Sequence, residues 1–111
     1  MQAVCRLEDI KPESGREVSV DTESGVVWLM LFRRGDQVHA FFNNCPHQGR
    51  ALNLGPERFL FDTHGQLVCP HHGACFDLQS GKCVSGPCQG DSLKRLKTRI
   101  VGVEVYVDLQ A

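Results

Sequence analysis

Short apolar runs separated by turn residues recur along this chain, and apolar positions with a helical period are nearly absent. Runs rich in β-branched and aromatic residues, bounded by glycine, proline, asparagine or aspartate, are typical of strands. The predicted strands are Ala3–Leu7, Glu17–Val20, Val26–Phe32, Gln37–Phe42, Leu67–Val68, Ala74–Asp77, Lys82–Val84, Lys97–Val101 and Val103–Val107. The pattern therefore predicts an all-β fold.

Glycine-containing turns are predicted between several of these strands. Arg34-Gly35-Asp36 and Ser80-Gly81 have the composition of hairpin turns, and Gly102 interrupts the last apolar stretch. Only Pro56 to Leu60 has the composition of a helical turn, and the pattern there is weak.

The middle of the chain differs in composition from both ends. Residues before about 43 and after about 90 have the pattern of a β scaffold, whereas the stretch between is dense in glycine, proline, cysteine and histidine. Such a stretch needs a constraint other than a hydrophobic core, and a bound metal supplies one. We expect one domain over residues 1–111, with a metal-binding lobe at about 43–90.

Charge and hydropathy exclude two classes of partner. The chain of 111 residues has a formal net charge of −1 and no dense basic run, so nucleic-acid binding is not expected. The longest apolar run, Val26–Phe32, is too short to cross a bilayer, and the N-terminus has no cationic leader followed by an apolar stretch. A cytoplasmic monomer that does not bind membranes is expected.

Two segments place a thiol and an imidazole on one tight turn. Cys45-Pro46-His47 has the form C-x-H, and Cys69-Pro70-His71-His72 contains C-x-x-H, with 21 residues between His47 and Cys69. Thiolate sulfur is a soft donor that suits iron–sulfur clusters, and imidazole suits iron. The spacing predicts two loops that hold one metal centre from opposite sides.

These motifs resemble the two cluster loops of Rieske [2Fe–2S] proteins. Cys45 to Gly49 is similar to the first loop, and Cys69 to Asp77 to the second loop and the strand that follows it. Ser85-Gly86-Pro87 is similar to the third, proline-containing loop of the family. The resemblance implies the Rieske fold: an antiparallel β-sandwich or barrel-like scaffold with an inserted two-loop cluster-binding subdomain.

The resemblance also implies the ligands. Cys45, His47, Cys69 and His72 would bind one [2Fe–2S] cluster per chain, and His71 would be a surface residue beside it. Two neutral imidazoles in place of thiolates raise the potential, to about −150 to +300 mV against about −400 mV in plant-type ferredoxins. Coupling to these imidazoles implies a midpoint that falls with rising pH in the alkaline range.

Three absences, of one disulfide and two hydroxyl groups, point to a low-potential subtype. In Rieske subunits of bc complexes the positions of Arg50 and His71 hold cysteines that form a disulfide, which is impossible here. Hydroxyl donors of the high-potential members are replaced by Ala74 and Phe76, and their loss lowers the potential. Residues Asn53 to Asp62 contain a small insertion relative to the family.

Alternative readings of the cysteines remain. The same donors suit a structural Cys₂His₂ zinc site, although zinc modules usually pair cysteine with cysteine. Cys5, Cys75, Cys83 and Cys88 are expected to be reduced thiols, with Cys75 and Cys83 packed near the cluster. A second metal site formed by Cys75, Cys83 and Cys88 is a less favoured alternative.

We expect an electron-transfer protein, not an enzyme, because no nucleophile or base constellation accompanies the motifs and no residue is assigned a catalytic role. The resemblance implies a soluble one-electron carrier between a reductase and a terminal oxygenase or other oxidoreductase. The alternative is a small subunit of a larger oxidoreductase, similar to that of assimilatory nitrite reductase. The basic residues Lys94, Arg95, Lys97 and Arg99 form either a solvated strand face or a surface for an acidic partner.

Overall fold

The computed structural model describes residues 1–46 and 49–109. These residues form ten strands and one short 3₁₀ helix. In chain order the elements are β1 (Gln2–Arg6), η1 (Leu7–Asp9), β2 (Gly15–Thr22), β3 (Gly25–Arg34), β4 (Gln37–Phe42), β5 (Leu60–Phe61), β6 (Leu67–Val68), β7 (Cys75–Phe76), β8 (Cys83–Ser85), β9 (Arg95–Val101) and β10 (Glu104–Asp108). The prediction of an all-β fold is confirmed.

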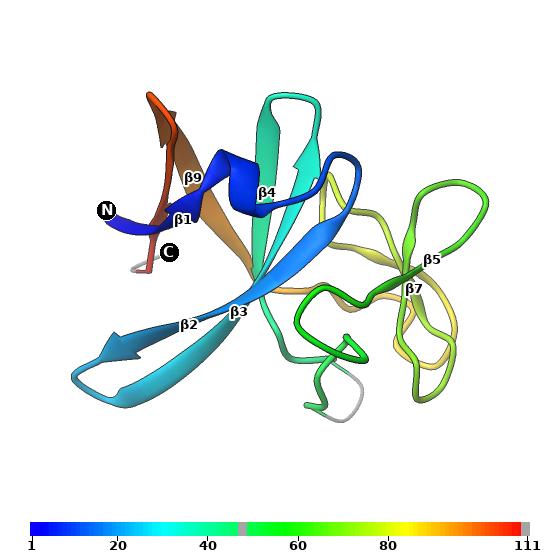
Figure 1. Cartoon of the computed structure of the whole chain (residues 1–111). Coiled ribbons are helices and arrows are strands. Elements are labelled where there is room, and N and C mark those ends of the chain that lie inside the picture. The colour runs from blue at the N-terminus through cyan, green and yellow to red at the C-terminus, as the bar shows by residue number, and fades with distance from the viewer. Residues whose placement is uncertain (47–48, 110–111) are drawn as a thin grey trace.

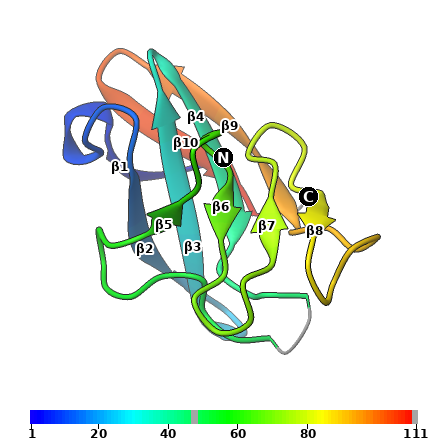
Figure 2. The ribbon, with the colours of Figure 1, turned by 90° about the vertical axis from the view of Figure 1, so that its right-hand side faces the viewer.

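The strands form two antiparallel sheets (Figure 1). The larger sheet has the order β1-β10-β9-β4-β3-β2 and curls into the scaffold, and the smaller sheet has the order β5-β6-β7-β8. Figure 2 shows the smaller sheet in front of β3, where it belongs to a lobe inserted between β4 and β9. The predicted barrel-like scaffold with an inserted subdomain is therefore present.

Strand β3 explains why the chain has one continuous apolar run. Leu29 and Leu31 belong to a core inside the scaffold, together with β4, β9 and β10, while Met30 and Phe32 belong to a second core shared with the lobe. Successive side chains of a strand point to opposite faces, so a strand that is covered on both faces needs apolar residues throughout. This strand therefore fixes the lobe against the scaffold.

The segment before β5 differs from the prediction. Pro56 to Leu60 forms no helical turn: Pro56 and Glu57 form a tight turn closed by an isolated bridge between Gly55 and Arg58, and Leu60 begins β5. The Arg58 amide donates to the Gly55 carbonyl at 3.1 Å. A proline followed by charged residues suits a β-turn as well as a first helical turn. Here Leu60 pairs with β6, and this pairing favours the β-turn.

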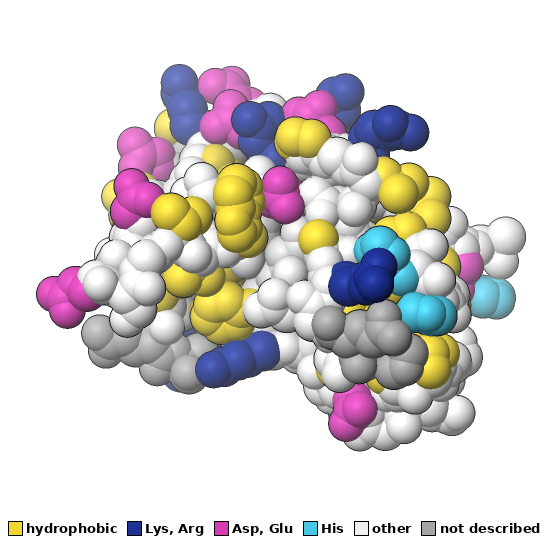
Figure 3. All heavy atoms as spheres, turned by 90° about the horizontal axis from the view of Figure 1, so that it is seen from below, with side chains coloured by type: hydrophobic (Ala, Val, Ile, Leu, Met, Phe, Trp, Pro, Cys, Tyr) yellow, Lys and Arg dark blue, Asp and Glu magenta, His cyan; other side chains and the backbone are white. Residues whose placement is uncertain are grey.

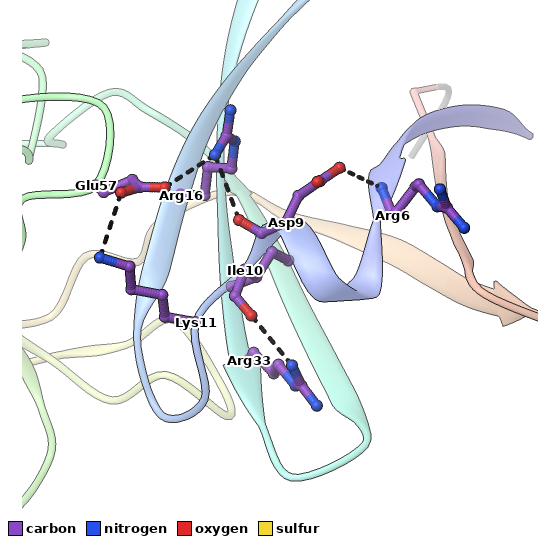
Figure 4. Close-up of polar contacts among 7 residues, drawn as sticks. All are labelled: Arg6, Asp9, Ile10, Lys11, Arg16, Arg33 and Glu57. Atoms are coloured by element: carbon purple, nitrogen blue, oxygen red, sulfur yellow. Dashed lines mark hydrogen bonds and ion pairs between the residues drawn. The ribbon is translucent and has the colours of Figure 1, made fainter.

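The same segment is tied to the scaffold by Glu57. Its carboxylate accepts a hydrogen bond from Arg16 Nη1 at 2.9 Å and lies 3.8 Å from Lys11 Nζ (Figure 4). Two residues after Glu57, the Phe59 ring packs edge-on against Phe32, with centroids 5.0 Å apart. The predicted insertion thus lies against the start of β2 and extends the core of the lobe.

None of the helical segments among the described residues is long and apolar enough to span a bilayer.

Candidate metal centre

Two loops of the lobe repeat one hydrogen-bonding scheme. In the first loop (residues 45–50) the Cys45 amide donates to the Arg50 carbonyl at 2.8 Å, and the Gly49 amide donates to the Cys45 carbonyl at 2.6 Å. In the second loop (residues 69–74) the Cys69 amide donates to the Ala74 carbonyl at 2.8 Å, and the Gly73 amide donates to the Cys69 carbonyl at 3.0 Å. The two cysteines therefore begin equivalent turns.

Glycine is required at the fifth position of each loop. Gly49 has φ +69° and Gly73 has φ +74°, which is the left-handed region that side chains other than glycine rarely adopt. A Cβ at either position would meet no atom within 4 Å, so it is the backbone conformation and not crowding that selects glycine. Both loops turn at the same end of the lobe (Figures 1 and 2).

The predicted ligands differ in exposure. The Cys45 and Cys69 side chains are buried, whereas His72 is exposed on the second loop. The fourth predicted ligand, His47, lies outside the described residues. Among the described residues no three histidine, cysteine, aspartate or glutamate side chains are close enough to hold a single ion.

A buried asparagine holds the first loop to the scaffold. The Asn43 side-chain amide donates to Glu17 Oε2 at 2.9 Å and to Asn53 Oδ1 at 3.0 Å, and its oxygen accepts from the Leu52 amide at 2.7 Å. The Asn43 backbone amide also donates to the Trp28 carbonyl of β3. Asn43 thus fixes the chain on both sides of the first loop, and nothing in the sequence pattern predicts this role.

The two loops meet at their surface. Arg50 Nη1 lies 3.5 Å from His71 Nδ1, and both side chains are exposed. Figure 3 views this end of the molecule and shows histidine side chains next to side chains of the Lys and Arg class. His71 is a surface residue, as predicted, and His72 lies beside it.

A third loop (residues 86–91) rests on the second. Gly86 has φ +97°, and a Cβ at this position would lie 2.7 Å from the Ala74 Cα. Only a glycine permits this approach. Gly86 belongs to the segment that resembles the family's third loop, and the structure places this segment against the second loop.

Cys88 lies at the inner side of the third loop. Its Sγ donates to the Cys83 Sγ at 3.1 Å, and both thiols are buried. Burial, and next the hydrogen bond and charge of Cys83, raise the pKa of the Cys88 thiol to about 12, with smaller contributions from Cys45. Cys88 is therefore a protonated thiol at neutral pH and lies close to a predicted ligand.

The remaining cysteines are separate from this group. Cys75 is half-buried on β7, with its Sγ 3.6 Å from the Gly73 carbonyl, and burial raises the pKa of the Cys5 thiol to about 11. Of the two thiols predicted to be packed near the cluster, Cys83 is buried and Cys75 is half-buried. Within residues 1–46 and 49–109, Cys75, Cys83 and Cys88 do not converge on a second metal site.

The donor set fits a Rieske cluster. Two buried thiols at equivalent turn positions and an exposed imidazole give soft donors on the inner side and a nitrogen donor on the outer side. Such a cluster takes two cysteines on one iron and two histidines on the other. In both loops, backbone hydrogen bonds to and from the cysteine hold the chain in a turn.

Comparison with known proteins gives a consistent result. The family model described as "Rieske [2Fe-2S] domain" matches residues 1–106. Human apoptosis-inducing factor 3 is 33% identical over 105 residues, which is 95% of this chain but only 16% of that protein, so the chain spans about a sixth of this curated relative. Ferredoxin CarAc of Metapseudomonas resinovorans is 31% identical over 86 residues, 77% of this chain and 72% of that ferredoxin.

Among solved structures, a chain in the complex of reduced oxygenase and oxidized ferredoxin of carbazole 1,9a-dioxygenase aligns with a TM-score of 0.74 and 29% identity. The alignment covers 96% of this chain and 90% of that one.

Proposed function

Since the chain belongs to the Rieske [2Fe–2S] domain family, we propose that it accepts single electrons from a reductase and passes them to a terminal oxygenase. Members of this family carry one [2Fe–2S] cluster per chain, which takes up and releases one electron at a time. This chain is accordingly an electron carrier, like the ferredoxins that it resembles. The oxygenase as acceptor is supported by the ferredoxin that is seen in complex with one.

We assign the cluster to Cys45, His47, Cys69 and His72, with the lobe at about 43–90 as the cluster-binding part of a single domain over 1–111. The duplicated hydrogen-bonding scheme of the two loops is the observation that carries this assignment. It holds the two thiols at equivalent places in the core, and it leaves His72 at the surface.

The exposed end of the lobe is the proposed exit for the electron. His72, His71 and Arg50 are exposed there, and a shallow groove begins at Gly49 and Ala51 and continues over Trp28 and Phe42. Electron-transfer complexes have small interfaces, so a partner needs to cover only this end. The buried thiols of Cys45 and Cys69 would hold the centre from the inside, and the exposed His72 would hold it at the surface.

Ligand variants test the assignment. After anaerobic reconstitution with iron and sulfide, Cys45→Ser, Cys69→Ser and His72→Ala should lose the visible absorption of the cluster, whereas His71→Ala should keep it. His71 is the matched control because it is the adjacent exposed imidazole. Retention of a normal cluster in His72→Ala, together with its loss in His71→Ala, would reassign the ligand.

The potential and the partner need separate measurements. We propose a midpoint in the lower part of the Rieske range, since Ala74 and Phe76 offer no hydroxyl to the cluster. A redox titration with a midpoint near the top of that range would contradict the low-potential subtype. When the reduced protein is mixed with an oxidised Rieske oxygenase in a stopped-flow instrument, the oxygenase should oxidise this protein within the time of one of its catalytic cycles.

A second role is a fixed component of a larger oxidoreductase. Its support is the match of 95% of this chain to about a sixth of a much longer human protein, in which a segment similar to this chain is therefore part of a longer chain. Gel filtration and light scattering of the native protein from its own cells distinguish the two. A monomer that exchanges electrons by collision supports the carrier, and a stoichiometric complex supports the subunit. The cytoplasm is the proposed location, and fractionation tests it.

A further inference from the structure

Two thiols outside the proposed ligand set face each other in the lobe. Cys83 and Cys88 have their Sγ atoms 3.1 Å apart, and their residues are 5% and 2% exposed. A disulfide bond is about 2.0 Å long, so closing the gap requires a movement of about 1 Å. By contrast, the half-buried Cys75 has a backbone carbonyl as its neighbour.

Backbone hydrogen bonds hold the two cysteines in one small loop. Cys83 begins β8, Gly86 turns the chain with φ +97°, and the Asp91 amide donates to the Cys88 carbonyl at 2.9 Å. The Cys83 amide donates in turn to the Asp91 carbonyl at 2.9 Å. These bonds keep both thiols on the inner side of one small loop, and they give the pair the high effective concentration of an intramolecular reaction.

The same loop covers the second cluster loop. Gly86 approaches the Ala74 backbone so closely that a Cβ would lie 2.7 Å from the Ala74 Cα. A covalent bond between Cys83 and Cys88 would therefore fasten the third loop in the position where it covers the second. It would use neither of the cysteines that we assign to the cluster.

We propose that Cys83 and Cys88 form a reversible disulfide that locks the third loop over the cluster end of the lobe. With a peroxide as oxidant, the Cys83 sulfur is first converted to a sulfenic acid as the O–O bond breaks and one water leaves; burial of both thiols and protonation of Cys88 make this step slow. The neighbouring sulfur then attacks, the S–S bond forms, and the second water leaves. The two thiols lose two electrons and two protons, and the peroxide takes up these electrons and protons as it becomes two molecules of water. A dithiol reductant restores the thiols and is itself converted to a disulfide.

Peptide mapping of the cluster-loaded protein tests this directly. After treatment with hydrogen peroxide, thiols are blocked with iodoacetamide and the protein is digested with trypsin. Cleavage after Lys82 and Lys94 places both cysteines on one peptide, residues 83–94, whereas Cys75 lies on the preceding peptide, residues 59–82. We expect peptide 83–94 to be unalkylated and lighter by two hydrogens, and to gain two alkyl groups when dithiothreitol precedes blocking.

Variants and cluster retention complete the test. Cys83→Ser and Cys88→Ser should each remove the two-hydrogen loss, and Cys75→Ser should retain it.

The rate at which an iron chelator removes the cluster absorbance is a second readout. This rate should be at least twofold slower in peroxide-treated than in dithiothreitol-treated wild type, and it should be equal after the two treatments in Cys88→Ser. Peptide 83–94 recovered doubly alkylated after peroxide, with cluster absorbance intact, would overturn the proposal. So would a bond from either cysteine to a different one. The wild-type map decides even if a variant fails to fold.

Discussion

Arg50 and His71 connect the two cluster loops across 3.5 Å, from the guanidinium Nη1 to the imidazole Nδ1. By the sequence resemblance, these positions correspond to those of the loop-bridging disulfide in Rieske subunits of bc complexes, and here they make a polar contact instead. Both side chains are exposed, and water screens such a contact. The contact therefore contributes little to folding, but it places a permanent positive charge at the cluster end.

Removal of that charge should lower the midpoint potential. In Arg50→Ala the added electron loses a nearby cation, and the equilibrium constant for reduction should fall by less than tenfold, which is less than about 59 mV for one electron. Arg50→Lys keeps the charge and serves as the control. Redox titrations at low and high salt measure the effect, which should shrink as salt rises. A higher midpoint in Arg50→Ala would show that the charge acts in another way.

The contact of the third loop with the second predicts a difference between two glycines. Gly86 and Gly90 both have strongly positive φ, +97° and +99°, but only Gly86 would place a Cβ against another backbone. Gly86→Ala should therefore unfold more easily than Gly90→Ala, by about 1–3 kcal/mol of overpacking added to a similar backbone strain. Urea unfolding measures the difference, and iron content should fall only in Gly86→Ala. Equal stabilities would mean that the loop moves away freely.

Asn43 should be far more sensitive to substitution than its neighbour. Asn43→Ala removes three side-chain hydrogen bonds and leaves the buried Leu52 amide without its acceptor, which costs about 1–3 kcal/mol. Asn44→Ala is the matched control, because that side chain is exposed. Thermal unfolding of both variants checks the expectation. Similar melting temperatures would remove Asn43 from the support of the first loop.

Because of His39, we expect the protein to lose stability in mild acid. Burial, and then the positive charges of Arg95 and Arg34, lower the pKa of His39 below 6.5, while Asp77 opposes them. Below pH 6.5 the unfolded chain therefore binds a proton more readily than the native protein does, and the free energy of unfolding falls as the pH falls towards the native pKa. The slope from this residue is at most about 1.4 kcal/mol per pH unit.

Urea unfolding of wild type and His39→Gln between pH 7.5 and 5.5 measures that slope. The variant should lose less stability over this range, since glutamine does not titrate. Parallel curves would assign the acid sensitivity to other groups.

The sequence alone predicted the scaffold well where a strand has a strong local pattern. Gln37–Phe42 and Leu67–Val68 coincide with β4 and β6, and the turn at Gly35 has φ +62°. The continuous apolar run of β3 was recognised as a strand, but its two-sided burial depends on the lobe that packs against it. Periodicity cannot assign the faces of a strand whose residues are all apolar.

The features that escaped prediction are contacts between distant parts of the chain. β5 has only two residues, too few to show alternation, and it exists because β6 pairs with it. Glu57 and Arg16 are separated by 41 positions, and neither belongs to a motif. The approach of Cys88 to Cys83 depends on the conformation of Gly86, which composition does not reveal. The sequence could predict the ligand motif because turn residues and metal donors are both local, and the assignment of the four ligands stays a prediction.

The most direct test of the account is the electron paramagnetic resonance of dithionite-reduced protein in which histidine carries ¹⁵N. A reduced two-iron cluster held by Cys45, His47, Cys69 and His72 predicts a one-electron signal with hyperfine coupling to two histidine nitrogens, and the His72→Ala variant should lose the cluster. A protein that contains zinc and gives no signal, or a reduced cluster without nitrogen coupling, would contradict the account.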